Sequence, residues 1–175
     1  MKNVHWLRRN EKGFNLLEII ITCAIFGIIA AVAIPGFSTW LPDYRLKGAV
    51  QDIYSNLHLT KMEAVKKNGN RSIVFDAGAG TYTKADGTTV KLSEYGSGVA
   101  YGRGNAGGGV DGEDFDNFIT YAVPDDEASF NSRGMGNNNG SGYVYLTNSN
   151  NRAYAVGSLI SGVILLKKWN GSDWG

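Results

Sequence analysis

The sequence predicts an α+β fold in which one long, hydrophobic N-terminal helix packs on an antiparallel β-sheet head domain. Three observations predict it: an apolar stretch over residues 14–34, an amphipathic helical pattern over 43–67, and short β-rich runs separated by Gly- and Asn-rich turns over 68–175. One helix laid on one sheet is an α+β arrangement. A chain of 175 residues is long enough for one modest domain of this kind.

Residues 1–13 form a short basic segment ahead of the apolar stretch. They carry four Lys and Arg side chains against a single acid, Glu11. At ~1.5 Å rise per residue, a helix over residues 14–34 would span roughly 30 Å, about the thickness of the hydrocarbon layer of a membrane. Because the basic residues flank only the N-terminal side, we expect the N-terminus to stay in the cytoplasm and the rest of the chain to be exported.

Three interpretations of this segment compete. It could be a plain membrane anchor, or a conventional secretory signal with Ala31-Val32-Ala33 as the cleavage site. The third interpretation depends on Glu18, the acid inside the apolar stretch. A carboxylate in a membrane helix costs on the order of 2.5–3.5 kcal/mol on insertion scales, so it usually has a partner.

The motif around Glu18 resembles a known signal. Gly13-Phe14-Asn15-Leu16-Leu17-Glu18, followed by an apolar helix that ends at Ile34-Pro35, resembles the type III signal of prepilins and pseudopilins, the type IV pilin family. The resemblance implies that prepilin peptidase cuts between Gly13 and Phe14 and N-methylates Phe14. It also implies that Glu18 pairs with the freed amine of a neighbouring subunit during assembly. Asn15 departs from the family pattern, where threonine is more frequent.

The resemblance carries further implications for the whole chain. It implies a pilin-like fold, a single-pass precursor in the bacterial inner membrane with a cytoplasmic N-terminus, and a periplasmic or extracellular head that later joins a filament. The implied partners are other pilins or pseudopilins, the prepilin peptidase and an inner-membrane assembly platform. The implied function is that of a minor subunit of a type IV pilus or a type II secretion pseudopilus. The alternative is a minor pilin that binds DNA for uptake in natural transformation.

The helical pattern continues beyond the apolar stretch. Apolar side chains recur with helical spacing and form a stripe that would lie on the sheet: Leu46, Val50, Ile53 and Leu57, widened by Ala49, Tyr54 and Ala64. Asn68-Gly69 is a typical helix stop. Pro35 and Pro42 each remove a helical hydrogen bond, so they predict kinks in one long helix over residues 14–67.

The remaining residues are predicted to form short strands. The candidate strands are 71–76, 118–123, 143–147, 152–156 and 162–169, together with a hairpin over 81–92. Asp86-Gly87 predicts a type I′ turn in that hairpin, and residues 148–151 predict a second hairpin turn. The order of segments from Phe130 to the C-terminal strand resembles the GspH/FimT branch of minor pseudopilins.

The sequence offers little for catalysis, and we predict that the chain is not an enzyme and holds no cofactor. It has two histidines and one cysteine, which provide no metal-ligand spacing and no nucleophile–base set. Residues 102–107 fit G-x-G-x-x-G, but the glycines that follow do not favour the helix that dinucleotide binding requires, so a flexible loop is expected.

Two weaker candidate sites and one aromatic group remain. A local cluster of hard oxygen ligands is a candidate calcium site: Asp111, Glu113, Asp114 and Asp116. Cations of the last third are candidate DNA contacts: Arg133, Arg152, Lys167 and Lys168. The nearly balanced charge of the chain, 17 basic against 16 acidic residues, does not favour nucleic acid as a partner.

The aromatics near the C-terminus fit core packing or an interface with a neighbouring subunit. They are Tyr143, Tyr145, Tyr154, Trp169 and Trp174.

Overall fold

A computed structural model of the chain describes residues 13–110, 112, 117–122, 126–137 and 141–175. The chain divides into two compact units, residues 1–38 and 39–175. One long helix, α1 (Leu16–Lys66), begins in the first unit and ends in the second. The helix continues without interruption through Pro35 and Pro42. Neither proline ends it, and the kinks at these two residues stay predictions.

Both ends of α1 carry a cap. Asn15 precedes the helix, and its side-chain Oδ1 accepts a 3.2 Å hydrogen bond from the backbone N–H of Leu17. At the other end Asn68 has a positive φ of 49°. The N–H of Gly69 donates to the carbonyl of Ala64 at 3.1 Å, and that of Asn68 donates to Val65 at 3.2 Å. This pair of bonds is a Schellman cap with Asn in the left-handed position, which confirms the predicted helix stop.

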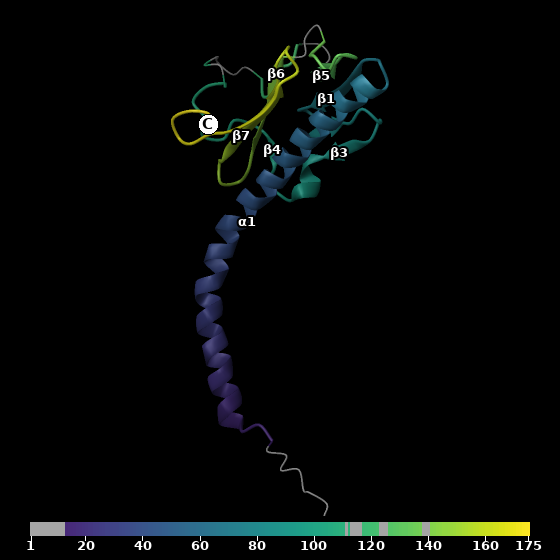
Figure 1. Cartoon of the computed structure of the whole chain (residues 1–175). Helices are drawn as coiled ribbons and strands as arrows, with labels where there is room; N and C mark the ends of the chain where they lie inside the picture. Colours follow the sequence, from purple (N-terminus) through teal and green to yellow (C-terminus); the bar gives the residue numbers. More distant parts are fainter. Residues whose placement is uncertain (1–12, 111, 113–116, 123–125, 138–140) are drawn as a thin grey trace, which may run out of the picture. The chain divides into compact units, whose positions relative to one another are not determined.

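The second part of α1 buries one face against the sheets. Its fully buried apolar side chains are Leu46, Ala49, Val50, Ile53, Leu57 and Ala64. Tyr54 is half-buried and packs against the same core. The predicted stripe is confirmed. Figure 1 shows this part of the helix with strands of both sheets beside it.

The described residues of the head form two antiparallel sheets of four strands each. The first has the order β3 (Thr89–Lys91), β2 (Thr81–Thr83), β1 (Arg71–Asp76), β5 (Glu127–Phe130). The second has the order β4 (Ala100–Tyr101), β6 (Gly142–Thr147), β7 (Ala153–Ser158), β8 (Ile164–Lys168). A short 3₁₀ helix, Leu92–Tyr95, follows β3. The predicted α+β fold, a long N-terminal helix with an antiparallel sheet head, is confirmed, but the head has two sheets where one was expected.

Two local predictions are wrong. A type I′ turn needs positive φ at both central residues, and in the β2–β3 hairpin Gly87 has φ 87° while Asp86 is not in this region. The N–H of Gly87 donates to the carbonyl of Lys84 at 2.9 Å, and the N–H of Lys84 donates to Thr88 at 2.9 Å. The loop is therefore three residues long, with its glycine in the left-handed position.

The second wrong prediction concerns the segment 118–122, which was predicted as part of a strand. It contributes only an isolated bridge between Ile119 and Val144.

The second sheet is buried on both faces. Val144 and Leu146 of β6 point into the main core, which also contains the buried face of α1. Tyr143 and Tyr145, on the opposite face of the strand, belong to a second apolar cluster that includes Trp174. Successive side chains of a strand alternate between faces, so the two tyrosines share one face of the sheet. Their burial, with that of Trp174, is core packing within the chain.

Candidate functional site

The predicted cleavage site lies immediately before the helix. Gly13 and Phe14 are outside α1 and both are exposed, with Phe14 81% accessible. A Cβ placed on Gly13 would meet nothing within 4 Å. The bond between the two residues therefore lies in an open, non-helical segment, which is the conformation that a peptidase can bind.

Asn15 and Glu18 occupy defined positions in the first turn of α1. Asn15 is the N-cap, because its side chain accepts from Leu17 and its carbonyl accepts from the N–H of Glu18 at 2.9 Å and of Ile19 at 3.3 Å. Glu18 is the third helical residue, where the positive end of the helix dipole favours a carboxylate. Its side chain is exposed. The carboxylate is thus accessible from outside the helix.

The remainder of the first unit presents apolar side chains to its surroundings. Every described residue from 13 to 38 is exposed, including the large side chains of Ile20, Phe26 and Ile29. The two hydroxyls here donate back to the helix, Thr22 to the carbonyl of Glu18 at 2.6 Å and Ser38 to that of Pro35 at 2.9 Å. By length and composition alone, α1 contains a stretch that could cross a membrane. A helix that is apolar all round needs an apolar environment or partner helices.

Comparison with known proteins identifies this N-terminal segment. Residues 8–34 match the family described as the prokaryotic N-terminal methylation motif, which covers Gly13, Phe14 and Glu18. The chain is type IV pilin-like. It is similar to the fimbrial protein EcpC of Eikenella corrodens, with 35% identity over 60 residues, and to a fimbrial protein of Moraxella nonliquefaciens, with 31% identity over 86 residues.

The likeness covers part of each protein. The aligned regions amount to 29% of this chain and 39% of the Eikenella protein, and to 49% of this chain and 51% of the Moraxella protein. The pilin-like chain therefore spans about half or less of the length of these relatives. Both are named as fimbrial proteins, and neither name states an enzymatic activity. No solved structure matches the chain.

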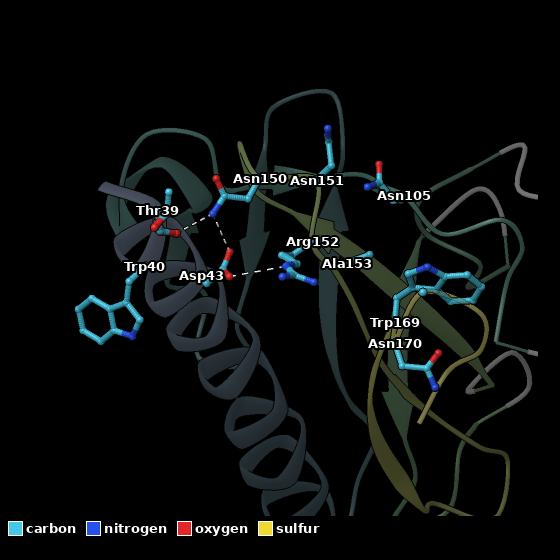
Figure 2. A pocket seen from close by; sticks show the side chains of 11 residues that line it. Thr39, Trp40, Asp43, Asn105, Asn150, Asn151, Arg152, Ala153, Trp169 and Asn170 are labelled. Atoms are coloured by element: carbon cyan, nitrogen blue, oxygen red, sulfur yellow. Dashed lines mark hydrogen bonds and ion pairs between the residues drawn. The ribbon is translucent and has the colours of Figure 1, made fainter. Parts of the chain in front are cut away.

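In the head of this pilin-like protein, Asp43 of α1 anchors the loop between β6 and β7. Its Oδ1 accepts hydrogen bonds from the side-chain amides of Asn148 at 2.7 Å and Asn150 at 3.0 Å. Its Oδ2 lies 3.7 Å from Nε of Arg152. The amide of Asn150 also donates to the carbonyl of Thr39 at 2.8 Å. Figure 2 shows the contacts of Asn150 and Arg152 meeting one turn of the helix.

A cavity of about 610 Å³ opens beside this anchor. Its lining is mainly polar and comes from four segments of the head: α1, the Gly-rich loop (residues 102–110, after β4), the β6–β7 loop and the residues after β8. The polar lining residues include Asn105, Asn150, Asn151, Arg152 and Asn170, and Trp169 supplies an aromatic ring (Figure 2). No local sequence pattern indicates this cavity, because its walls are distant in sequence.

The four candidate DNA contacts are placed differently from one another. Lys167 and Lys168 are successive residues of β8, so their side chains leave opposite faces of the sheet. Nζ of Lys167 donates to the carbonyl of Trp174 at 3.4 Å, and Nζ of Lys168 lies 5.9 Å from the centroid of the Tyr154 ring. Arg152 faces Asp43, and Arg133 is exposed in the turn after β5. Three of the four cations thus have partners within the chain.

The candidate calcium ligands lie outside the described residues. Asp111, Glu113, Asp114 and Asp116 are all in the segments for which no structure is given. Among the residues that the structure does describe, no group of three or more His, Cys, Asp and Glu side chains is placed to hold a metal ion. The calcium site stays a prediction.

A polar network lies at the edge of the main core. The hydroxyls of Tyr82 and Tyr95 both donate to Oδ2 of Asp52, Tyr82 at 2.5 Å, and the two hydroxyl oxygens are 3.0 Å apart. Burial, and after it the hydrogen bond to Asp52, together raise the pKa of Tyr95 to about 12. The pKa of Tyr82 is raised for the same two reasons. Both tyrosines therefore stay neutral donors to Asp52 across the physiological pH range, and the network fixes the 3₁₀ helix against α1.

Two sets of positioning residues were missed by the sequence analysis. Asn15 was considered only as a departure from the family pattern, although Asn followed three residues later by Glu18, just before an apolar run, is the signature of a helix N-terminus. The pairing of Asp43 with the β6–β7 loop has no local signal, because the two partners are separated by 105 positions in the sequence.

Proposed function

We propose that the chain is a minor subunit of a type IV pilus or a type II secretion pseudopilus, made as a membrane-inserted precursor and assembled into a filament. The observation that carries this proposal is the exposed apolar surface of residues 13–38, most of which lie within the match to the methylation motif over residues 8–34. The rest of the chain does not cover this apolar helix. In the proposal, lipid covers it first and the helices of other subunits cover it later.

In this proposal, Glu18 sets the register of assembly. Cleavage after Gly13 creates a free amine at Phe14, four residues before the carboxylate. Both charges are costly inside an apolar medium unless they are paired. The exposed Glu18 of one subunit would accept the amine of a neighbour, which offsets both desolvation costs and fixes the axial position of the two helices.

The partners proposed here follow from the same chemistry. Prepilin peptidase would remove residues 1–13 and methylate Phe14 at the inner membrane, with the N-terminus in the cytoplasm and the head on the other side. An inner-membrane assembly platform would then move the subunit into the filament. The fimbrial proteins to which the chain is similar support a filament, and the resemblance of the head to minor pseudopilins supports a minor role.

The first test is the mass and N-terminal residue of the mature protein, isolated from membranes of cells that contain the peptidase. We expect a chain that begins with N-methyl-Phe14. A terminus near Ile34 would instead establish a conventional signal peptide, and an uncut chain would establish a plain anchor. Either of these results contradicts the proposal.

The second test is recruitment of variants into purified filaments. We expect Glu18→Ala to be processed normally and to be absent from filaments. Glu63→Ala is the matched control, since Glu63 is an acid on the later part of the same helix and forms an ion pair with Lys67 at 3.1 Å. Normal recruitment of Glu18→Ala would contradict the proposed role of the carboxylate. The other subunits in those filaments would distinguish a pilus from a secretion pseudopilus.

A further inference from the structure

The Gly-rich loop and the β6–β7 loop form two walls of the cavity beside Asp43. The backbone N–H of Asn105 donates to the carbonyl of Asn151 at 3.0 Å, which ties the Gly-rich loop to the β6–β7 loop. Gly104 has φ +53°, and a side chain there would clash with the backbone of Asn151. Two walls of the cavity are therefore fixed through the main chain.

Several side chains of the cavity lining are hydrogen-bond donors and acceptors that these main-chain contacts do not use. Within the described part of the chain, no hydrogen bond reaches the side-chain amides of Asn105 and Asn151, and both residues are exposed. Asn170 uses its Oδ1 to accept from the backbone of Ser172 at 2.9 Å and of Asp173 at 2.9 Å. This arrangement orients Asn170 and leaves its NH₂ group without a partner among the described residues. Amides offer both donors and acceptors at fixed positions.

A third wall of the cavity is an aromatic ring, and a second aromatic ring packs against it. The ring of Trp169 is half-buried and meets the ring of Trp174 edge-on, with centroids 5.4 Å apart. Trp174 is buried and donates from its indole nitrogen to the carbonyl of Gly108 at 2.9 Å. The backbone N–H of Trp169 donates to Ala153 at 3.0 Å. Trp169 is thus a fixed ring at the cavity that a ligand can contact without reordering it.

The charges of the lining cancel. Asp43 and Arg152 are its charged members and they face each other at 3.7 Å. An anionic ligand such as nucleic acid would meet a carboxylate beside the single cation, and a cationic ligand would meet the reverse. A neutral ligand fits better. It should carry many groups that both donate and accept, to match the amides, and an apolar face, to match the indole ring.

We propose that this cavity binds a neutral saccharide. Each sugar hydroxyl donates and accepts at once, so vicinal hydroxyls match the amides of Asn105, Asn151 and Asn170. The C–H face of a pyranose ring is apolar and packs on the indole of Trp169. Arg152 is held by Asp43 and can donate to a ring or hydroxyl oxygen through its remaining N–H groups. This binding is independent of filament assembly, since its groups all lie in the head.

The test uses the full chain in lauryldimethylamine oxide micelles, because detergents with sugar headgroups would compete for the site. The protein is applied to an array of neutral and acidic glycans, and the best neutral oligosaccharide is titrated by calorimetry and by tryptophan fluorescence. We expect binding to neutral glycans with a Kd on the order of 10⁻⁴–10⁻³ M, a range typical of a small solvent-accessible site.

Variants then locate the site. Asn105→Ala should weaken binding about tenfold, since one amide with two hydrogen bonds is lost. Trp169→Phe should weaken it while leaving a ring to pack on Trp174, and an unchanged near-UV circular dichroism spectrum would show that the fold is kept. Asn70→Ala, at an exposed asparagine outside the cavity, is the matched control and should bind as the unmodified chain does.

Three outcomes would overturn the proposal. Retention of no neutral glycan on the array would exclude a saccharide site. Equal binding by Asn105→Ala, Trp169→Phe and the control would place the site elsewhere. A preference for acidic glycans or for a DNA oligonucleotide, weakened by Arg152→Ala, would assign the cavity to an anionic ligand.

Discussion

The indole nitrogen of Trp174 donates a hydrogen bond to the carbonyl of Gly108, 2.9 Å away and 66 positions earlier in the sequence. This bond closes the second apolar cluster, because it holds the Gly-rich loop over the face of β6 that carries Tyr143 and Tyr145. Val110 in the same loop donates its N–H to the hydroxyl of Tyr145 at 3.0 Å. The loop is therefore a cover for the second sheet.

Replacing Trp174 should destabilise the head strongly. Trp174→Ala removes a buried ring and its hydrogen bond, and we expect a loss of about 3–5 kcal/mol in the free energy of unfolding. Trp174→Phe keeps a ring and should lose about 1 kcal/mol. Urea denaturation followed by near-UV circular dichroism measures both. Trp40→Phe is the control, since Trp40 is 54% exposed and Phe can still stack on Tyr44. A small effect of Trp174→Ala would show that the loop is not a cover.

Gly104 and Gly107 form a matched pair in the same loop. Gly104→Ala should cost about 1–3 kcal/mol, because it places a side chain in the left-handed region and against the backbone of Asn151. Gly107→Ala should be nearly neutral, since its Cβ would meet nothing within 4 Å. Thermal unfolding of the two variants checks this difference. Equal melting temperatures would contradict the structure of the loop.

Asp43 should contribute more to the stability of the head than Arg152, the cation that it faces. Asp43→Ala leaves the amide of Asn148, which is only 3% exposed, without its acceptor, and we expect a loss of about 1–3 kcal/mol. Arg152→Ala removes only an exposed ion pair, which is worth about 0–1 kcal/mol and is screened by salt. The comparison is made by denaturant unfolding at low and high ionic strength. The reverse order of the two losses would show that the ion pair is the anchor.

The stability of the head should fall at high pH. The pKa of Tyr95 is raised from 10.0 to about 12 in the folded chain, so folding favours the neutral hydroxyl. Its contribution is complete below pH 10, the unfolded value, and is lost as the pH rises through about 12. Tyr95→Phe should therefore show a shallower decline of the unfolding free energy between pH 9 and 12 (roughly the range set by these pKa values). An identical slope in both proteins would contradict the assignment.

The cap at the start of α1 can be tested separately from assembly. Asn15→Ala should cost the first turn about 1 kcal/mol, because the N–H of Leu17 loses its acceptor. Asn15→Thr should retain most of the cap, since threonine is also an N-cap residue. Amide hydrogen exchange of residues 17–20 in micelles measures the difference. Equal exchange in the two variants would show that the side chain of Asn15 does not cap the helix.

Local patterns predicted the parts of the fold that depend on local interactions. The helix, its stop at Asn68 and the β1 strand follow from periodicity and turn residues, and the structure confirms them. The division of the head into two sheets could not be predicted in this way. It depends on β5 pairing with β1, for example Ile73 with Ala128, across more than fifty positions.

The candidate sites show the same difference between residues that are close in the sequence and residues that are distant in it. Gly13, Phe14 and Glu18 lie within six positions, so a motif could indicate them, whereas the cavity combines residues from position 39 to position 171. Asn105 and Asn151 come together only through a main-chain bond that no side-chain pattern signals. The expectation that residues 102–107 are a loop agrees with the structure, which shows no helix after them in the described residues. The role of this loop as a cover had no signal in the sequence.

The position of Asp43 has a mechanical consequence for the head. A tensile force transmitted along α1 from its N-terminal side reaches the Thr39 and Asp43 contacts before it reaches the buried stripe that begins at Leu46. These hydrogen bonds would bear the load together, in shear, through the two asparagines of one short loop. Detachment of the helix under load should therefore begin by breaking polar contacts, and the apolar stripe would yield only after they have failed.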